Sequence, residues 1–408
     1  MVAKFLFHVA LCVSGLIKVA TAVPAISPAT NERPARAIYF QTNEADNSIV
    51  ALKVGENGTL SREFVTSTGG MGASSINSAN NLTASPDGLS SQGSVTVVGS
   101  NLFAVNAGDN TVSIFAIDEH DPTRLVLLGA PALVPGDFPV SVTASERNQL
   151  VCAATSGSLG GVACAPYSPA GGIGEFDFLR HFDLDQAALP SSPLDTIAEI
   201  HFSQDETLLI TTVKGDPAVN KTGYISAYSV TGGSPYNCAR VSAADIRSEV
   251  NGTAVLFGFE QIPNTENYFV ADATFGAAII AVNESTQVST LLHKTEIPGQ
   301  RATCWSVVSS QTNSAFVTDP LVKHIVEMSL DDASILSITN LTTTNDATGF
   351  IDLVATGLYI YALAPGSENG TDAEVVVVSL ANKKKTLVEA FNIGDWAGTS
   401  AQGMALYP

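Results

Sequence analysis

The sequence predicts an all-β protein: a seven-bladed β-propeller with four-stranded antiparallel blades, whose ring is closed by the N- and C-terminal strands. Three observations support this. Short apolar runs with polar ends recur seven times along the 408 residues, further short strand candidates flank each run, and convincing amphipathic helices are nearly absent. Four short strands in each of seven units is the arithmetic of a propeller.

The recurring apolar run is the clearest element of each unit. Neighbouring copies are 44 to 63 residues apart, which is a repeat period. The copies lie at residues 38–43, 102–108, 150–155, 209–215, 268–272, 315–320 and 359–365.

Other strand candidates accompany each run. One precedes it, as at 94–98 or at 199–202, where a tight turn at 203–206 follows. A third strand comes after the run, at residues 110–117, 223–228 and 277–282 in the clearest units.

The remaining segments complete the unit or interrupt it. A variable fourth strand is expected at 124–128, and residues 403–407 are expected to close the ring, which removes the open sheet edges that favour aggregation. The polar stretch 66–92 is expected to be a long loop inside the first repeat. The best helix candidate is the short segment 242–250, interpreted as an insertion.

Two β-sandwiches or a right-handed β-helix are the alternative architectures. The repeats are too long for a β-helix, and two sandwiches would need a linker, whereas no Pro/Ser-rich or charged break occurs in mid-chain. We therefore expect a single propeller domain over residues 37–408, preceded by an N-terminal extension at 23–36.

Residues 1–22 have the pattern of a secretory signal peptide. Lys4 supplies the positive charge, residues 5–17 are an apolar stretch too short for a transmembrane anchor, and Ala20-Thr21-Ala22 is a small-residue cleavage site. This predicts a secreted, extracellular protein, and association with a cell wall is a further hypothesis.

Seven N-x-[ST] glycosylation acceptors agree with secretion. They are Asn57, Asn81, Asn220, Asn251, Asn283, Asn340 and Asn369.

The cysteines also agree with an oxidising compartment. Once Cys12 leaves with the signal peptide, four remain. Cys152 and Cys164 flank a Gly/Ser-rich turn between apolar runs, as a cross-strand pair in a hairpin would. We predict the 152–164 disulfide, which leaves Cys238 to pair with Cys304.

The charge balance limits the partners. With 39 acidic and 19 basic side chains the net charge is −20, which argues against nucleic acid and anionic membrane surfaces. We expect a monomer whose partner is a small carboxylate or lactone substrate, or a component of an extracellular matrix or wall.

Four segments of the chain have a pattern shared with a known family: residues 91–94, 106–115, 139–142 and 304–308. They resemble the lactonase-type seven-bladed propellers, a family that includes bacterial 6-phosphogluconolactonase and the fungal carboxymuconate-lactonising enzyme. The resemblance extends over residues 37–408, and the chain is most similar to a secreted fungal branch labelled carboxymuconate cyclase-like. The resemblance implies a propeller acting on lactones or unsaturated polycarboxylates.

This chain departs from the catalytic pattern that the resemblance implies. Lactonising members carry a His after a Pro at the opening of the third blade, and an Arg and a Glu around the inner strands of the fourth. Here the third opening, 138–141, has no His, the fourth, 196–200, has no Arg, and the strand expected to carry the Glu ends at Lys214 without a carboxylate.

Propeller geometry identifies a second group of candidate site residues, because the loops that enter the innermost strands share one face with the turns between second and third strands. Lys214 and Arg301 could together hold a carboxylate there, and Asp272 or Asp319 could act as an acid or base if buried. The alternative is that these residues cap turns. Further ligand-binding candidates at this rim are Gln92, Asn106 and Asp109.

No metal or cofactor signature is present in the sequence, so no cofactor and no metal site are predicted. A calcium site remains one open alternative, because Asn106, Asp272 and Asp319 supply oxygen ligands of the kind that Ca²⁺ prefers.

Two functions of different classes therefore remain. One is a secreted lactonase or carboxymuconate cyclase-like enzyme, an intramolecular lyase or lactone hydrolase. The other is a non-catalytic extracellular or cell-wall glycoprotein of adhesin or antigen type that binds a matrix or carbohydrate partner.

Overall fold

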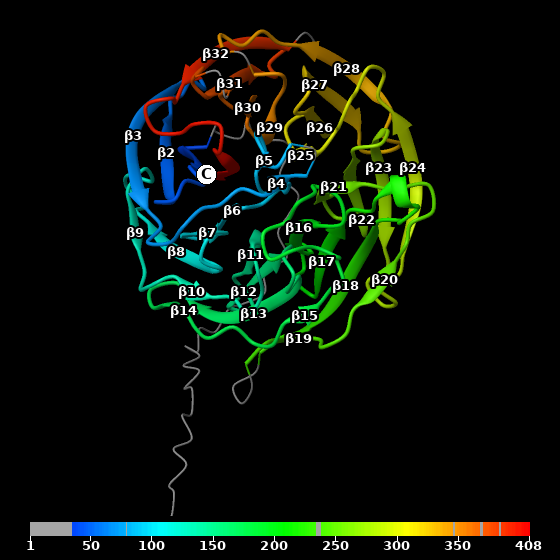
Figure 1. Cartoon of the computed structure of the whole chain (residues 1–408). Coiled ribbons are helices and arrows are strands. Elements are labelled where there is room, and N and C mark those ends of the chain that lie inside the picture. Colours follow the sequence, from blue (N-terminus) through cyan, green and yellow to red (C-terminus); the bar gives the residue numbers. More distant parts are fainter. Residues whose placement is uncertain (1–34, 79, 234–237, 346, 368–369, 383–384) are drawn as a thin grey trace, which may run out of the picture.

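The chain forms a closed ring of seven sheets, shown in order from blue to red in Figure 1. The computed structural model describes residues 35–78, 80–233, 238–345, 347–367, 370–382 and 385–408. The expected signal peptide and residues 23–34 of the expected extension lie outside these ranges. The predicted seven-bladed propeller with four-stranded antiparallel blades is confirmed.

The innermost strands form the wall of a central channel. Each contacts the innermost strands of both neighbouring blades, so that the seven close a ring. From blade 1 to blade 7 they are β33 (Gln402–Tyr407), β6 (Val95–Val98), β11 (Pro139–Ser145), β16 (Ile197–Phe202), β21 (Leu256–Gln261), β25 (Trp305–Ser309) and β29 (Ile351–Thr356).

The second strands are the seven apolar runs of the sequence, as predicted. Their side chains are almost all buried, because both faces of each sheet pack against neighbouring blades. They are β1 (Ala37–Gln41), β7 (Asn101–Asn106), β12 (Leu150–Thr155), β17 (Leu208–Val213), β22 (Asn267–Asp272), β26 (Ser314–Asp319) and β30 (Tyr359–Ala364).

The third strands are long and regular, and they include the three predicted at 110–117, 223–228 and 277–282. They are β2 (Ser48–Val54), β8 (Thr111–Ile117), β13 (Gly161–Ser168), β18 (Tyr224–Thr231), β23 (Gly276–Val282), β27 (Val322–Ser329) and β31 (Glu374–Ser379).

The outer strands are the variable ones. Blades 2, 3 and 4 have two short pieces in this position, and the strand predicted at 124–128 is one of them. The outer strands are β3 (Leu60–Ser67), β9 (Leu125–Leu127) with β10 (Ala132–Leu133), β14 (Gly172–Ile173) with β15 (Arg180–His181), β19 (Arg240–Val241) with β20 (Ile246–Ser248), β24 (Ser289–Glu296), β28 (Ile335–Asn340) and β32 (Thr386–Asn392).

Blade 1 closes the ring with strands from both ends of the chain. Its order is β3-β2-β1-β33, and β1 pairs antiparallel with β33, with Ala37 opposite Tyr407 and Tyr39 opposite Ala405. The predicted closing strand is confirmed. Unfolding of blade 1 therefore requires β1 to separate from β33, so the stability of this blade depends on strands from both ends of the described chain.

Tyrosines on second strands tie neighbouring blades together. The buried hydroxyl of Tyr39 donates to the carbonyl of Pro122 at 2.6 Å, and that of Tyr361 donates to the carbonyl of Gly58 at 2.9 Å. Gly58 has a φ of +79°, and a Cβ there would lie 2.4 Å from the ring of Tyr359, so this turn requires glycine.

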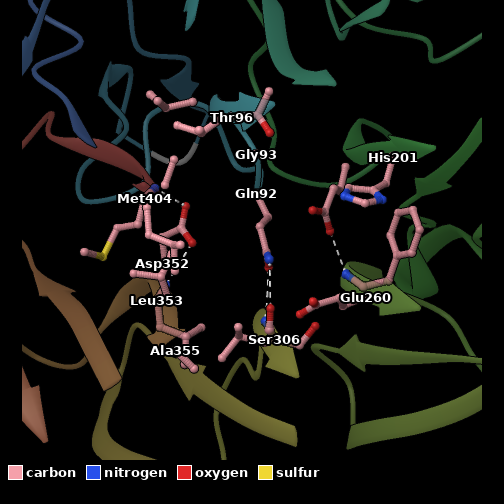
Figure 2. A pocket seen from close by; sticks show the side chains of 18 of the residues that line it. Gln92, Gly93, Thr96, His201, Glu260, Ser306, Asp352, Leu353, Ala355 and Met404 are labelled. Atoms are coloured by element: carbon pink, nitrogen blue, oxygen red, sulfur yellow. Dashed lines mark hydrogen bonds between the residues drawn. The ribbon is translucent and has the colours of Figure 1, made fainter. Parts of the chain in front are cut away.

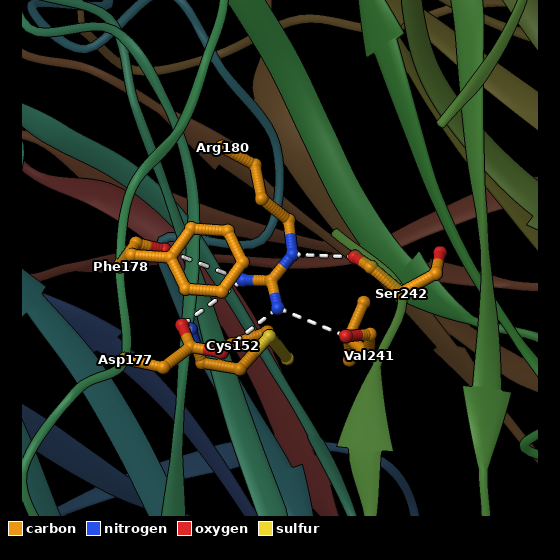
Figure 3. Close-up of a disulfide and its surroundings, with 7 residues drawn as sticks. Cys152, Asp177, Phe178, Arg180, Val241 and Ser242 are labelled. Carbon is orange, nitrogen blue, oxygen red and sulfur yellow. Dashed lines mark hydrogen bonds and ion pairs between the residues drawn. A yellow bond between two sulfur atoms is a disulfide. The ribbon is translucent and has the colours of Figure 1, made fainter. Parts of the chain in front are cut away.

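The predicted disulfide between Cys152 and Cys164 is present, and it joins a directly opposed pair on β12 and β13 (Figure 3). Beside it, the buried guanidinium of Arg180 bonds Asp177 at 2.8 Å and donates to the carbonyls of Val241 and Ser242. This arginine ties blade 3 to blade 4.

The second predicted disulfide is wrong. Cys304 is a buried free thiol immediately before β25, at the channel. Cys238 is exposed between β18 and β19, at the outer edge of blade 4. The prediction paired them by elimination, and spacing alone carried no information on which side of the blade each would face.

The helix predicted at 242–250 is also wrong. Residues 246–248 form β20, which pairs with Ile225–Ala227 of β18. A nine-residue helix is marginal in water, whereas an open sheet edge offers backbone partners at once. Within the described ranges the helical element is the 3₁₀ turn η1 (Pro217–Val219), and no helix there is long and apolar enough to cross a membrane.

The loop predicted at 66–92 is present, and it contains a small hairpin of β4 (Ile76–Asn77) and β5 (Leu82–Thr83). In the view of Figure 1 this hairpin projects onto the middle of the ring. Its backbone bonds the segment before blade 4, through Ile76 N–H to the Pro190 carbonyl and Ser78 N–H to the Ser191 carbonyl. The loop thus crosses from blade 1 toward blade 4.

Replacing both Cys152 and Cys164 with Ala should lower the free energy of unfolding by about 3 kcal/mol, because a 12-residue separation then no longer restricts the unfolded chain. Chemical denaturation of the oxidised proteins measures the difference. Equal stability of the variant and the original protein would contradict a stabilising role for this disulfide.

Candidate functional site

The two faces of the ring differ in what they carry. We call the upper face the one with the loops that enter the innermost strands and the turns between second and third strands. The lower face has the turns between first and second strands. All seven candidate rim residues lie at the upper ends of their blades, namely Gln92, Asn106, Asp109, Lys214, Asp272, Arg301 and Asp319.

Lys214 is buried at the upper end of the channel. Its ammonium group donates to the carbonyl of Ser90 and lies 4.6 Å from the ring centroid of Phe257. Burial lowers the pKa of Lys214, and the nearby carboxylate of Asp87 partly offsets this effect. The ammonium group of Lys214 therefore has its hydrogen-bond acceptor within the chain itself.

Arg301 is in a different environment, with its side chain exposed to solvent just before β25. The backbone N–H groups of Arg301 and Ala302 donate to one carboxylate oxygen of buried Asp319, at 2.6 and 2.8 Å, and Leu321 N–H donates to the other. Lys214 and Arg301 thus do not share an open pocket, and Asp319 caps its own turn.

The other rim residues also have local partners. Asp272 accepts from Ala254 N–H at 2.8 Å and from the backbone and side chain of Thr274. Asn106 accepts from the side-chain amide of Asn47, in the turn between β1 and β2, at 2.9 Å, and Asp109 accepts from Thr111. The oxygens proposed for Ca²⁺ are used in three separate turns, and the described residues contain no group of three His, Cys, Asp or Glu side chains placed to hold a metal ion.

Gln92 reaches across the channel from blade 2 to blade 6. Its side-chain amide donates to the carbonyl of Ser306 at 2.8 Å and accepts from Ser306 N–H at 3.0 Å (Figure 2). Gly258 lies against it, because a Cβ at that position would come within 1.9 Å of the Gln92 amide oxygen.

Gln92 ends a segment, residues 87–92, that we call the strap. The strap accepts a hydrogen bond from Lys214 and exchanges two with Ser306. Its backbone and side chains also form hydrogen bonds with four further residues at the upper ends of innermost strands. Leu89 N–H donates to Gln402, Ser91 Oγ donates to the carbonyl of Val140, Trp305 Nε1 donates to the carbonyl of Ser91, and Gln92 N–H donates to the carbonyl of Ala198.

These bonds attach the strap to blades 1, 3, 4 and 6. Asp87 adds a further contact, since its carboxylate accepts from Gln402 Nε2 at 2.6 Å, and desolvation raises its pKa. The strap therefore lies across the upper end of the channel and occupies the position where an upper-face ligand would reach Lys214.

Below the strap, the channel holds a cavity of about 270 Å³ lined by residues of innermost strands. Three carboxyl side chains and one imidazole line it: Glu199, Glu260, Asp352 and His201. In the view of Figure 2, Asp352 lies on one side of Gln92, and Glu260 and His201 lie on the other.

Each carboxyl group accepts a backbone N–H from the next blade. Glu199 accepts from Phe259 at 2.6 Å, Glu260 from Val308 at 2.6 Å, and Asp352 from Met404 at 2.9 Å. The donors lie on β21, β25 and β33, whose channel-side edges have no further strand to pair with, so the N–H groups on those edges need other acceptors. The carboxyl side chains satisfy such donors.

Burial raises the pKa of all three carboxyl groups. Desolvation raises the pKa of Glu260 to about 7 and that of Asp352 to about 7. The pKa of Glu199 is raised well above its ordinary value, by desolvation and then by the charges of Asp352 and Glu260. At mildly acid pH this cavity thus contains carboxylic acids that can donate hydrogen bonds.

His201 completes the group. Its Nδ1 lies 2.7 Å from the carbonyl of Phe202, which fixes Nδ1 as the protonated nitrogen and leaves Nε2 as an acceptor. Nε2 has no hydrogen-bond partner among the described residues, and burial lowers the pKa of His201, so the imidazole is neutral. Glu199 and His201 are two residues apart on β16 and share a face of that strand.

Cys304 does not add a nucleophile to this site. It lies beside the strap, and burial raises the pKa of its thiol well above the ordinary value. A protonated thiol is a poor nucleophile.

The sequence reasoning selected the upper rim and missed the channel carboxyl groups and His201. A signal existed for one pair, because strand alternation in residues 199–202 places Glu199 and His201 on one face of a predicted innermost strand. Glu260 and Asp352 gave no comparable signal, since which face of an innermost strand points into the channel depends on the register shifts.

More than nine-tenths of the chain is similar in fold to solved seven-bladed propellers. A structure described as a putative 6-phosphogluconolactonase from Bacteroides fragilis superposes with a TM-score of 0.61 at 12% identity, and the alignment covers 93% of this chain and 99% of that one. A periplasmic gluconolactonase from Pseudomonas aeruginosa gives a TM-score of 0.67 at 12% identity, covering 91% and 99%. These neighbours agree with the lactonase-like architecture expected from the sequence.

A protein from Lactobacillus plantarum gives a TM-score of 0.61 at 14% identity, covering 91% of this chain and 98% of that one. No family model matches the sequence, and no curated protein matches it. At these identities the similarity establishes the fold, and the chemistry has to be argued from the residues of the channel.

Replacing Lys214 with Met should lower the free energy of unfolding by about 2 kcal/mol, because the strap loses the charged donor to Ser90. Thermal or denaturant unfolding measures this loss. The matched control is Lys53→Met, on the exposed face of β2, and equal stability of the two variants would contradict the role of Lys214 as a strap anchor.

The channel carboxyl groups also predict a pH dependence of stability. Between about pH 4 and pH 7 the folded protein keeps protons on Glu260 and Asp352 that the unfolded chain has already released. The free energy of unfolding contributed by these groups should therefore be fully present at acid pH and decrease as the pH rises through this range. Glu260→Gln should reduce that slope, whereas the exposed Glu119→Gln should leave it unchanged.

Proposed function

We propose that this protein hydrolyses small uncharged lactones in its central channel, with His201 as the general base and protonated Glu199 as the donor to the carbonyl oxygen. The observation that carries this proposal is the neutral imidazole beside a buried carboxylic acid on one strand face, in a cavity of about 270 Å³. A cavity of this size accommodates a sugar-sized ring, and the group provides one proton acceptor and one proton donor.

The reaction follows from those two roles. Nε2 of His201 accepts a proton from a water molecule as the water oxygen attacks the lactone carbonyl carbon. The free oxygen of protonated Glu199 donates a hydrogen bond to the carbonyl oxygen as negative charge develops there. The ring C–O bond then breaks, and the imidazolium returns its proton to the alkoxide, which gives a hydroxy acid.

The lining favours an uncharged lactone over an unsaturated polycarboxylate. Glu199, Glu260 and Asp352 are acidic, and the described residues that line the cavity include no Lys or Arg. A polycarboxylate would lose its hydration there without gaining a cationic partner. The carboxylate product would likewise have no cationic partner among the described lining residues, which favours its release.

The fold similarity to a structure described as a periplasmic gluconolactonase makes lactones the first substrate class to test.

We also propose that the protein is secreted and N-glycosylated. Six of the seven predicted acceptors lie in the described residues, and all six are exposed. Asn369 lies outside the described residues.

A non-catalytic extracellular or wall glycoprotein is the second candidate. The observation that favours it is the upper face, where Asp272 and Asp319 are used in turns and the strap covers Lys214. A partner of this kind would bind the outer surface rather than the channel.

The test is hydrolysis of glucono-δ-lactone by the purified mature protein, followed by acid release against the spontaneous rate. His201→Asn should lower kcat/KM at least about 100-fold, because loss of a general base typically costs 10²- to 10⁴-fold. The control is His120→Asn, whose side chain is fully solvent-exposed and far from the channel strands. Absence of any turnover by the wild-type protein would leave the glycoprotein as the better candidate.

The pH dependence of kcat/KM gives an independent check. The rate should rise as His201 loses its proton, below the usual pKa of an exposed histidine, because burial lowers its pKa. It should fall again as Glu199 ionises, well above the usual pKa of a glutamate. A rate that increased steadily into alkaline solution would contradict the role of Glu199 as a donor.

A further inference from the structure

We propose that small uncharged molecules reach the channel from the lower face, past the lower ends of the innermost strands of blades 2, 3 and 4, and that this opening excludes anions. The inference deepens the proposed function and rests on it for the identity of the substrate. The route itself rests on the arrangement of the strap and the cavities.

The upper end of the channel is closed by the chain. The strap bonds innermost-strand residues of blades 1, 3 and 6 and Ala198 of blade 4, and Gln92 spans the channel to Ser306 with two hydrogen bonds. Opening it would expose buried Lys214 without its acceptor, the carbonyl of Ser90. A substrate arriving from above would meet this hydrogen-bonded segment before it reached the cavity.

The lower end has a second cavity of about 290 Å³. It is lined by the lower halves of β6, β11 and β16 and by the turn at residues 203–206, in which Gln204 is exposed. Thr96, Val97 and His201 line both cavities, so the two adjoin. The proposed route leads from the lower surface past these residues to the imidazole of His201.

The lining of this path selects against anions. Glu206 lines the lower cavity, held by Ser145 Oγ and Arg147 N–H, and three acidic groups lie beyond it. Among the described residues that line the two cavities, none is Lys or Arg. A phosphorylated or carboxylated lactone would lose its hydration here without gaining a cation.

Diethyl pyrocarbonate tests the route without relying on catalysis, because this small uncharged reagent acylates unprotonated imidazole nitrogen. Peptide mass spectrometry would follow the rate at His201, with fully exposed His120 as the internal reference. Thr96→Trp, at the junction of the cavities, should slow the reaction of His201 about tenfold. Leu321→Trp, an exposed position on the upper face, should change it less than twofold.

The outcomes separate the route from the function. The lower route would be overturned if Leu321→Trp blocked the modification of His201, or if Thr96→Trp left its rate unchanged. Failure of His201 to react in the wild-type protein would overturn it as well. Modification through the lower opening, with no hydrolysis of glucono-δ-lactone, would retain the route and reject the lactonase proposal. Circular dichroism and thermal unfolding would show whether each variant is folded. If Thr96→Trp does not fold, Thr96→Phe, with a smaller side chain, replaces it in the experiment.

The exclusion of anions has its own test. Wild-type protein should hydrolyse glucono-δ-lactone with a kcat/KM at least tenfold higher than 6-phosphogluconolactone, and Thr96→Arg should reduce that ratio by placing a cation at the opening. Equal kcat/KM values for the two lactones in the wild-type protein would overturn the exclusion of anions.

Discussion

The interaction on which the channel depends is the hydrogen bond from a backbone N–H of one innermost strand to a carboxyl side chain of the blade before it. Glu199, Glu260 and Asp352 each accept such a bond. The need arises because each innermost strand is the edge of its sheet, and a buried backbone donor without a ladder partner is costly. The same bonds that join the blades therefore place acidic groups around the cavity and raise their pKa values by burial.

The strap is the second determinant of the site. A ring of seven innermost strands leaves a channel open at both faces, and this chain uses the long insertion between blades 1 and 2 to close the upper one. Lys214, which at the sequence level looked like a ligand for a substrate carboxylate, serves as a donor to Ser90 within that closure. Closing one face also explains why the chemistry we propose lies deeper, at Glu199 and His201, than the rim.

The closure limits what the channel can accept. A buried set of carboxyl groups without cations excludes charged acids but suits a neutral ring that develops negative charge only during the reaction. This distinguishes the proposed chemistry from that of a cation-lined site for polycarboxylates, although both can be built on the same ring of blades. Fold similarity to lactonase-like propellers at 12% identity is compatible with either, so the residues of the channel decide between them.

The sequence by itself determined the repeat, the second strands, the closing strand and the Cys152–Cys164 pair, because alternation and short hairpins depend on local spacing. It also placed Gln92, Lys214, Asp272 and Asp319 at the correct face, since strand order fixes which end of a blade each residue occupies. Only the tertiary structure decided that Cys304 stays reduced at the channel, that residues 246–248 join a sheet edge, and that the strap covers Lys214. It likewise brought Glu199, Glu260 and Asp352 together from three blades. The hydrogen bonds of these three carboxyl groups and of Lys214 join residues 48 to 124 positions apart, and no local pattern encodes them.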